Sequence, residues 1–253
     1  MALEIFNSDD LQSKKGSGVK TNSKSDRKKP EFPAGVFVVT DIKQAVKNPN
    51  RASVYINGKY RFSLDVYQLT ELKVKMGTTF NEDELQNLEQ QSEFGKLYAR
   101  TLEYCLMRPH SEKEVRDYLW KKTMSRRLKN KKTGEIYDKQ GVSKISVDQV
   151  LKRLKDKDYI NDERFSRWWV ENRNQRKGTS LKKLRLELQQ KGVSSDIITL
   201  VLEESCRSDE EEITKIIAKK GSRYTDQNKL IAYLVRQGFS YDDIKRALNH
   251  ETD

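Results

Sequence analysis

The hydrophobic positions of residues 180–204 recur at helical spacing on both sides of one glycine. Before the glycine, a serine that can cap a helix is followed by an apolar stripe of Leu181, Leu184 and Leu188. Gly192 provides a helix stop, and a second helix follows with apolar positions at Ile197, Ile198, Val201 and Leu202. The segment therefore predicts two helices separated by a glycine.

The same pattern returns in residues 226–250. Gly238 corresponds to Gly192, and the flanking positions also correspond: Ser240 to Ser194, Ile244 to Ile198 and Leu248 to Leu202. Subtracting 192 from 238 gives a period of 46 residues, a length typical of a repeated helical unit. We therefore expect both glycines to occupy equivalent left-handed positions after their helices.

A more divergent copy precedes these two. Its second helix is predicted to start at the capping box Ser111–Glu114, followed by apolar positions at Val115, Tyr118 and Leu119. Its closing helix is predicted to start at a second capping box, Ser146–Gln149, with apolar positions at Val147, Val150, Leu151 and Leu154. A polar insertion lies between them and takes the place of the expected glycine.

Each copy also has a leading helix. In the first copy this helix runs from Phe94 to Leu106 and ends before Pro109. The leading helices of the other two copies are marked by Phe165, Trp168, Trp169 and Asn172, and by Ile213, Ile216 and Ile217. Nine helices in three units are thus predicted between Phe94 and His250.

The apolar pattern changes to that of strands between Val36 and Leu64. Two β-rich runs, residues 51–56 and 60–64, flank Asn57-Gly58, the dipeptide favoured in two-residue hairpin turns. With a third run starting at Val36 they predict a small antiparallel sheet. A short helix at Val66, Leu69 and Leu72 and an acidic helix from about Asn81 are expected to cover it.

The predicted fold class is mostly α: three tandem three-helix repeats, elongated, preceded by a small antiparallel β-sheet and helix extension and a disordered N-terminal tail. The low share of hydrophobic residues, 35%, also argues against one compact core. The tail is polar, serine-rich and basic. The expected segments are the tail 1–34, the extension 35–91, the first repeat 92–159 with a basic insertion 121–144, the second repeat 160–206 and the third repeat 207–253.

Three stretches resemble the RecX family of recombinase regulators. They are Arg108–Val115, the segment Leu151–Leu154 with Tyr159–Phe165, and Glu187-Leu188 before Lys191-Gly192-Val193. The run Tyr-Ile-Asn-Asp-Glu-Arg-Phe is the most specific part. The resemblance covers about Val36 to the C-terminus and implies tandem three-helix repeats that bind the RecA recombinase filament and restrain its assembly and activity. The insertion is longer than the tight turn expected there, and the tail has no counterpart in the family's core pattern.

The net charge of +12 indicates a polyanionic partner or an acidic protein surface. Thirteen cations face six acids between Lys152 and Lys191, and an ordinary solvated face is the alternative interpretation. The predicted partner- or nucleic-acid-binding residues are Arg164, Arg167, Arg173, Arg176, Lys177, Lys182, Lys183 and Arg185. A secondary basic patch is predicted in the insertion, as a hairpin tip or a flexible loop, at Arg126, Arg127, Lys129, Lys131 and Lys132.

Trp168 and Trp169 are adjacent, so they point in different directions around their helix. One of them is a candidate interface residue, with burial between repeats as the alternative.

No catalytic constellation is recognisable. Phosphate-binding loops and paired histidines are absent, and His110 and His250 are the only histidines. Acidic runs such as Asp209–Glu212 fall at predicted helix starts, where they complement the helix dipole. We therefore expect no enzyme activity, no cofactor and no metal.

Two cysteines without metal spacing and the lack of a long apolar run favour a soluble cytoplasmic protein with no membrane contact. We also expect it to be a monomer. Two functional classes stay open. One is a regulator docked on a RecA filament, with single- or double-stranded DNA as a further partner. The other is a sequence-independent DNA-binding protein with helix-turn-helix-like units. No third helix concentrates Asn, Gln and Arg in its first turn, as base reading would require.

Overall fold

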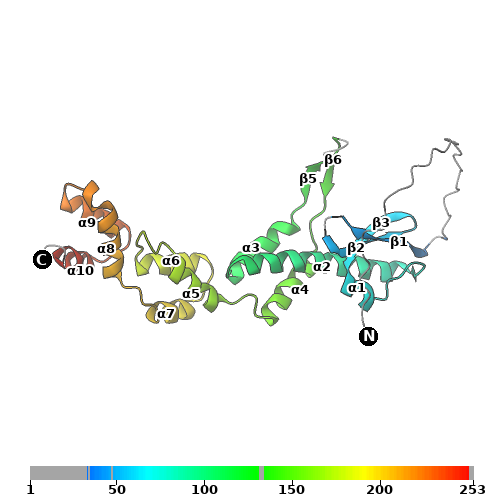
Figure 1. The fold of residues 1–253 in the computed structure, drawn as a ribbon, viewed down its shortest axis with the longest axis horizontal. Helices are drawn as coiled ribbons and strands as arrows, with labels where there is room; N and C mark the ends of the chain where they lie inside the picture. The colour runs from blue at the N-terminus through cyan, green and yellow to red at the C-terminus, as the bar shows by residue number, and fades with distance from the viewer. Residues whose placement is uncertain (1–32, 34, 47, 131–133, 251–253) are drawn as a thin grey trace, which may run out of the picture.

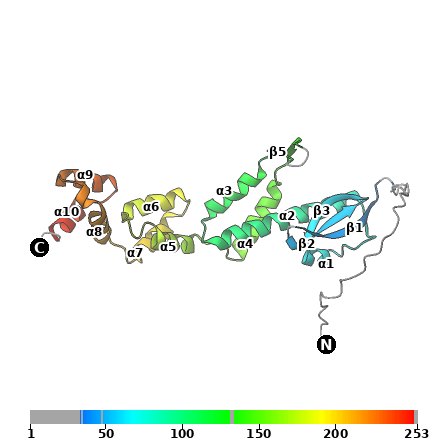
Figure 2. The same ribbon diagram turned by 45° about the horizontal axis from the view of Figure 1, so that its top comes forward.

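The computed structural model describes residue 33 and residues 35–46, 48–130 and 134–250. These residues form an elongated row of helical units with a small sheet at one end (Figure 1), and the same row is seen after rotation (Figure 2). The mostly α fold with a preceding antiparallel sheet is thereby confirmed. The tail predicted to be disordered, residues 1–34, lies outside the described residues except for Pro33.

The extension contains a four-stranded antiparallel sheet in the order β3-β2-β1-β4. Asn57 and Gly58 have φ angles of +49° and +77°, as a two-residue turn of type I′ requires, so the predicted hairpin is confirmed. The strand that pairs with β1 at the sheet edge, β4, was not predicted. The elements are β1 (Phe37–Ala45), β2 (Asn48–Ile56), β3 (Lys59–Asp65), α1 (Val66–Glu71) and β4 (Thr79–Phe80).

A single long helix, α2 (Glu82–Met107), joins the extension to the first repeat. Asn81 and Glu84 form a reciprocal capping box at its start. The acidic helix and the leading helix of the first repeat, which we treated as separate, are therefore one element, and the expected limit between residues 91 and 92 falls inside it. No proline interrupts residues 82–107, so the two helical patterns run together.

The remainder of the first repeat consists of α3 (Glu112–Thr123), the hairpin strands β5 (Arg126–Lys129) and β6 (Ile136–Lys139), and α4 (Lys144–Asp156). Of the two forms considered for the insertion, the hairpin is the one observed (Figure 1). The predicted capping box at Ser146 was wrong. Ser143 is the N-cap of α4, and Ser146 is the buried third residue of that helix and donates a hydrogen bond to Glu93 Oε1 at 2.7 Å.

The other two repeats have three α-helices each. They are α5 (Asp162–Asn172), α6 (Leu181–Gln190) and α7 (Ser195–Glu203), followed by α8 (Asp209–Lys220), a short 3-10 turn (Gly221–Arg223), α9 (Gln227–Arg236) and α10 (Tyr241–His250). Gly192 and Gly238 follow α6 and α9 with φ angles of +80° and +99°. Their predicted equivalence is confirmed, and the residues at the matching helix positions, Leu188 and Leu234, are both fully buried.

Consecutive repeats are joined by the same pair of hydrogen bonds. The capping serine of one second helix donates to the carbonyl of the C-cap residue of the next second helix: Ser111 Oγ to Lys191 O at 2.8 Å and Ser180 Oγ to Gln237 O at 2.7 Å. In addition, the acid at the start of each following leading helix accepts a hydrogen bond from the first backbone amide of the second helix in the preceding repeat. Asp162 accepts from Glu112 N at 2.7 Å. This repetition fixes each unit against its neighbour and produces the extended row.

Candidate interaction surfaces

The predicted cations of the second repeat come from three consecutive pieces of chain. Arg164 and Arg167 lie on α5, and three follow it in the connecting segment: Arg173, Arg176 and Lys177. The remainder lie on the first half of α6: Lys182, Lys183 and Arg185. No single helix face collects all eight.

Both arginines on α5 are held by carboxylates of the same chain. Arg164 donates to the Asp158 carboxylate at 2.9 Å. Arg167 contacts Glu163 at 2.7 Å and Glu204 at 2.6 Å, so it connects α5 to the end of α7. Both arginines are about half exposed, and exposed pairs of this kind contribute only about 0 to 1 kcal/mol.

The Arg173 side chain is held in place by contacts within the protein. It donates two hydrogen bonds to Glu187, at 2.8 and 3.0 Å, and lies 5.1 Å from the centre of the Trp169 ring. The Trp169 indole donates to the same carboxylate at 3.1 Å. Burial acts to raise the pKa of Glu187, but the Arg173 hydrogen bond and charge outweigh it, so the pKa is lowered. This bidentate pair therefore fastens α5 to α6.

Three of the eight predicted cations are free in the described part of the chain. Lys183 donates to Gln237 Oε1 at 3.2 Å and Arg185 to Thr199 Oγ1 at 3.1 Å, so both engage neighbouring helices. Among the eight predicted cations, the exposed side chains that make no ion pair with any described residue are those of Arg176, Lys177 and Lys182. The connecting segment and the first turn of α6 thus offer the accessible positive charge of the second repeat.

Both tryptophans lie at the junction between the first and second repeats. They are half-buried, and each carries a cation over its ring: Arg108 at 5.2 Å from the Trp168 ring and Lys191 at 5.3 Å from the Trp169 ring. Because Arg108 belongs to the first repeat, its contact with Trp168 crosses the junction. Neither indole is a fully exposed interface residue.

Glu114 is the centre of this junction. Its carboxylate contacts Arg108 at 3.0 Å, His110 Nδ1 at 3.0 Å and Lys191 Nζ at 2.7 Å. Burial acts to raise its pKa, but the hydrogen bonds and charges of Arg108 and Lys191 outweigh burial and lower the pKa to about 2. Burial and the Arg108 charge lower the pKa of His110.

The predicted capping box at the start of α3 is only half correct. The Ser111 side chain accepts a hydrogen bond from the Glu114 amide at 3.1 Å. The Glu114 carboxylate binds the junction cations and is not used to cap the Ser111 amide. The sequence contained a clue in Arg108, a cation six residues before the glutamate, but Lys191 is 77 residues away from Glu114.

The secondary basic patch lies on β5, whose residues are all exposed. Arg127 approaches Asp138 across the hairpin at 3.4 Å, and Arg126 donates to the Lys121 carbonyl at 3.1 Å. Lys129 is exposed on the same strand. Two further residues of the predicted patch, Lys131 and Lys132, lie outside the described residues.

Two parts of the chain match family models. Residues 161–202, which contain α5, α6 and all but the last residue of α7, match the second three-helix domain of RecX, and residues 210–248 match its third three-helix domain. The resemblance to the RecX family is thereby confirmed. The two matched RecX domains coincide with the two repeats that carry Gly192 and Gly238.

Similar proteins cover most of the chain. A regulatory protein RecX of Listeria innocua is 29% identical over 216 residues, covering 83% of this chain and 74% of that protein. A regulatory protein RecX of Listeria monocytogenes is 28% identical over 221 residues, covering 85% and 76%. A crystal structure of regulatory protein RecX shares the fold with a TM-score of 0.59 at 19% identity, covering 84% of this chain and 99% of that one. These relatives are named as regulators and not as enzymes.

None of the described helices is both long enough and apolar enough to cross a membrane.

Proposed function

We propose that this protein binds the filament of a RecA-type recombinase and lowers its assembly or activity. The observation that carries the proposal is the pair of RecX three-helix domains set in one extended row of repeats. A row of units joined by identical hydrogen bonds presents a long surface, which suits a partner that is itself a repeating polymer.

The contact is proposed to involve the free cations of the second repeat. Arg176, Lys177 and Lys182 are exposed and unpaired among the described residues, so a partner carboxylate or phosphate meets them without first breaking an internal ion pair. Arg164 and Arg167 already have carboxylate partners, which reduces their net gain on binding. Arg173 is assigned to fold stability because of its bidentate pair with Glu187.

A second candidate function is direct, sequence-independent binding to DNA. The net charge of +12 and the exposed basic hairpin favour it. Phosphate contacts and contacts to protein acids differ in one measurable respect. Each single-stranded phosphate that a cation neutralises steepens the salt dependence of DNA affinity by about 0.7 logarithmic units.

The test is a pulldown of purified RecA by the full chain, with and without single-stranded DNA, coupled to the recombinase's ATPase and strand-exchange activities. The variant removes the free cations: Arg176→Ala, Lys177→Ala and Lys182→Ala. A matched control removes three cations whose side chains already bind other residues of the chain: Arg164→Ala, Arg167→Ala and Lys183→Ala. We expect the first variant to lose filament binding and inhibition more than the control does.

The outcomes separate the two candidates. Weaker filament binding with unchanged binding to naked DNA indicates a contact to protein acids, whereas a shallower salt slope on naked DNA indicates phosphate contacts. If the wild-type protein neither binds the filament nor changes recombinase activity, the proposed function is wrong.

A further inference from the structure

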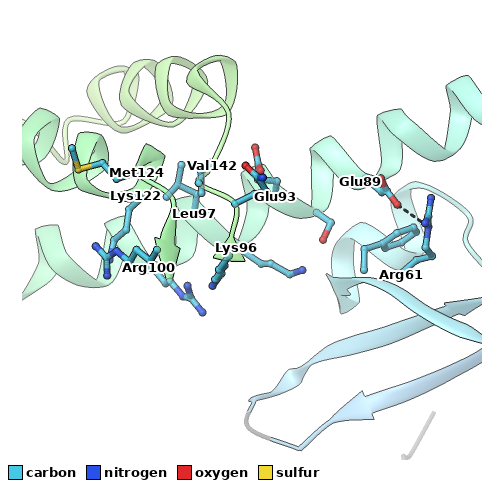
Figure 3. A pocket seen from close by; sticks show the side chains of 15 residues that line it. Arg61, Glu89, Glu93, Lys96, Leu97, Arg100, Lys122, Met124 and Val142 are labelled. Carbon is cyan, nitrogen blue, oxygen red and sulfur yellow. Dashed lines mark ion pairs between the residues drawn. The ribbon is translucent and has the colours of Figure 1, made fainter. Parts of the chain in front are cut away.

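A basic cleft lies where the extension, α2 and the hairpin meet (Figure 3). It encloses about 620 Å³ and is lined by residues of β3, α2, the end of α3 and the base of the hairpin. The cations among its lining residues are Arg61, Lys96, Arg100, Lys122, Arg126 and Lys139, and the acids are Glu89 and Glu93. We call this site the hairpin cleft.

Both acids of the hairpin cleft already have partners. Glu89 pairs with Arg61 at 3.0 Å, shown by the dashed line in Figure 3. Glu93 accepts hydrogen bonds from the Ser143 and Ser146 hydroxyls at 2.8 and 2.7 Å, so it serves the start of α4. Five of the six cations therefore have no carboxylate partner among the described residues.

The unpaired cations repel one another. Lys96 and Arg100 lie one turn apart on α2 and point to the same side of the helix (Figure 3). Lys96 is half-buried, and burial lowers its pKa, as do the charges of Arg51, Arg100 and Lys139. A cluster of like charges in a concave site is stabilised by an anion that enters it.

The base of the hairpin is fixed, so the cleft exists without a ligand. The Val142 amide donates to the Lys122 carbonyl at 2.9 Å. Gly141 lies so close to the Thr123 carbonyl that any Cβ at this position would overlap it. These contacts hold the base of the hairpin beside α3 and keep Lys139 in the lining of the cleft, where its charge acts on Lys96.

We propose that the hairpin cleft binds the phosphate groups of a single-stranded nucleic acid. The positive charge does not end in the cleft, because Arg126 at its edge leads along the exposed strand β5 to Arg127 and Lys129. A linear row of cations matches the spaced phosphates of a strand better than a single compact anion. The lining contains no exposed aromatic ring, so contact through the backbone without base preference is expected.

This site is separate from the second repeat, and the inference rests on the second candidate function, direct binding to DNA, and not on the proposed regulation of a recombinase. Its test uses the full chain, a labelled oligothymidylate and no recombinase, with affinity measured by fluorescence anisotropy over a series of salt concentrations. The variant is Lys96→Gln, Arg100→Gln and Lys139→Gln. A matched control removes three exposed lysines of the extension: Lys59→Gln, Lys73→Gln and Lys75→Gln.

We expect the cleft variant to lose at least about tenfold in affinity at low salt, with a salt slope smaller by about 2, since three cations at about 0.7 each are removed. The control should keep the wild-type slope. Far-ultraviolet circular dichroism and a thermal melt check the fold, and the cleft variant should melt no lower than wild type because repulsion has been removed.

Two results would overturn the inference. One is an equal loss of affinity in the cleft and control variants, because net charge alone would then explain the effect. The other is that pyrophosphate saturates the cleft and the oligonucleotide does not displace it. The ligand of the cleft would then be a small compact anion.

Discussion

Replacing Glu114 with Gln tests whether the junction between the first two repeats depends on a buried charge. The side chain is only 11% exposed and contacts two cations and a histidine. Lowering its pKa from 4.5 to about 2 corresponds to about 3 kcal/mol of stability at neutral pH, at about 1.4 kcal/mol per pH unit. Arg108 and Lys191 are each about one third exposed and regain water in the variant, so we expect a loss of about 1 to 3 kcal/mol.

The direction of the pKa shift determines how the stabilisation by Glu114 changes with pH. The folded pKa of Glu114 lies below its unfolded value, so the stabilisation is complete above about 4.5 and is lost as the pH falls toward about 2. The difference in unfolding free energy between wild type and Glu114→Gln should therefore be largest near pH 7. It should shrink steadily below pH 4.5 and nearly close at about pH 2.

Tryptophan fluorescence during urea unfolding is the assay, because Trp168 and Trp169 lie under junction cations. The third tryptophan, Trp120, lies on α3 and is replaced by Phe in every background so that the signal comes from the junction. Glu103→Gln, on an exposed position of α2, is the matched control and should change stability by less than about 0.5 kcal/mol. A pH-independent difference, or one no larger than the control, would refute the assignment of Glu114 as the junction's charged centre.

Two further predictions concern the repeat framework. Gly238→Ala should destabilise the protein by more than about 1 kcal/mol in thermal unfolding, because φ is +99° and the added Cβ would come within 2.7 Å of a serine hydroxyl in the preceding repeat. Gly77→Ala, at φ +82° with open space around it, measures the cost of the positive φ angle without any close contact. An equal loss of stability in both variants would argue against a contribution from the close contact at Gly238. Leu188→Ala and Leu234→Ala each remove a fully buried side chain and should cost about 2 to 5 kcal/mol in denaturant unfolding, whereas losses below about 0.5 kcal/mol would contradict their place in the core.

The repeat could be predicted because its determinants are local. A glycine is needed where the chain takes a left-handed conformation, and an apolar residue is needed at every buried helical position, so Gly192 and Gly238 mark the period directly. The turn at Asn57-Gly58 is local in the same sense. Such features require no knowledge of the rest of the chain.

The features that were missed depend on partners far away in sequence. In the sequence Glu114 has the position of a capping residue, and only the fold brings Lys191 beside it. Several predicted binding arginines pair with internal carboxylates. Lys96 is an ordinary helical lysine in the sequence, and only the fold places Lys139 of the hairpin near it. Charge counts along the chain cannot distinguish a paired arginine from a free one.

The long helix α2 has a consequence for the geometry of the whole chain. Leu88 packs in the core of the extension and Leu97 in the core of the first repeat, so nine residues of one rigid helix set the angle between the two cores. Each residue of an α-helix turns the chain by about 100° and advances it by about 1.5 Å. One residue inserted between them would swing the sheet about a quarter turn around the repeats and carry Arg61 away from the hairpin. The length of this segment can therefore change only by about whole turns, and the helix sets the rotational phase between the two parts of the molecule.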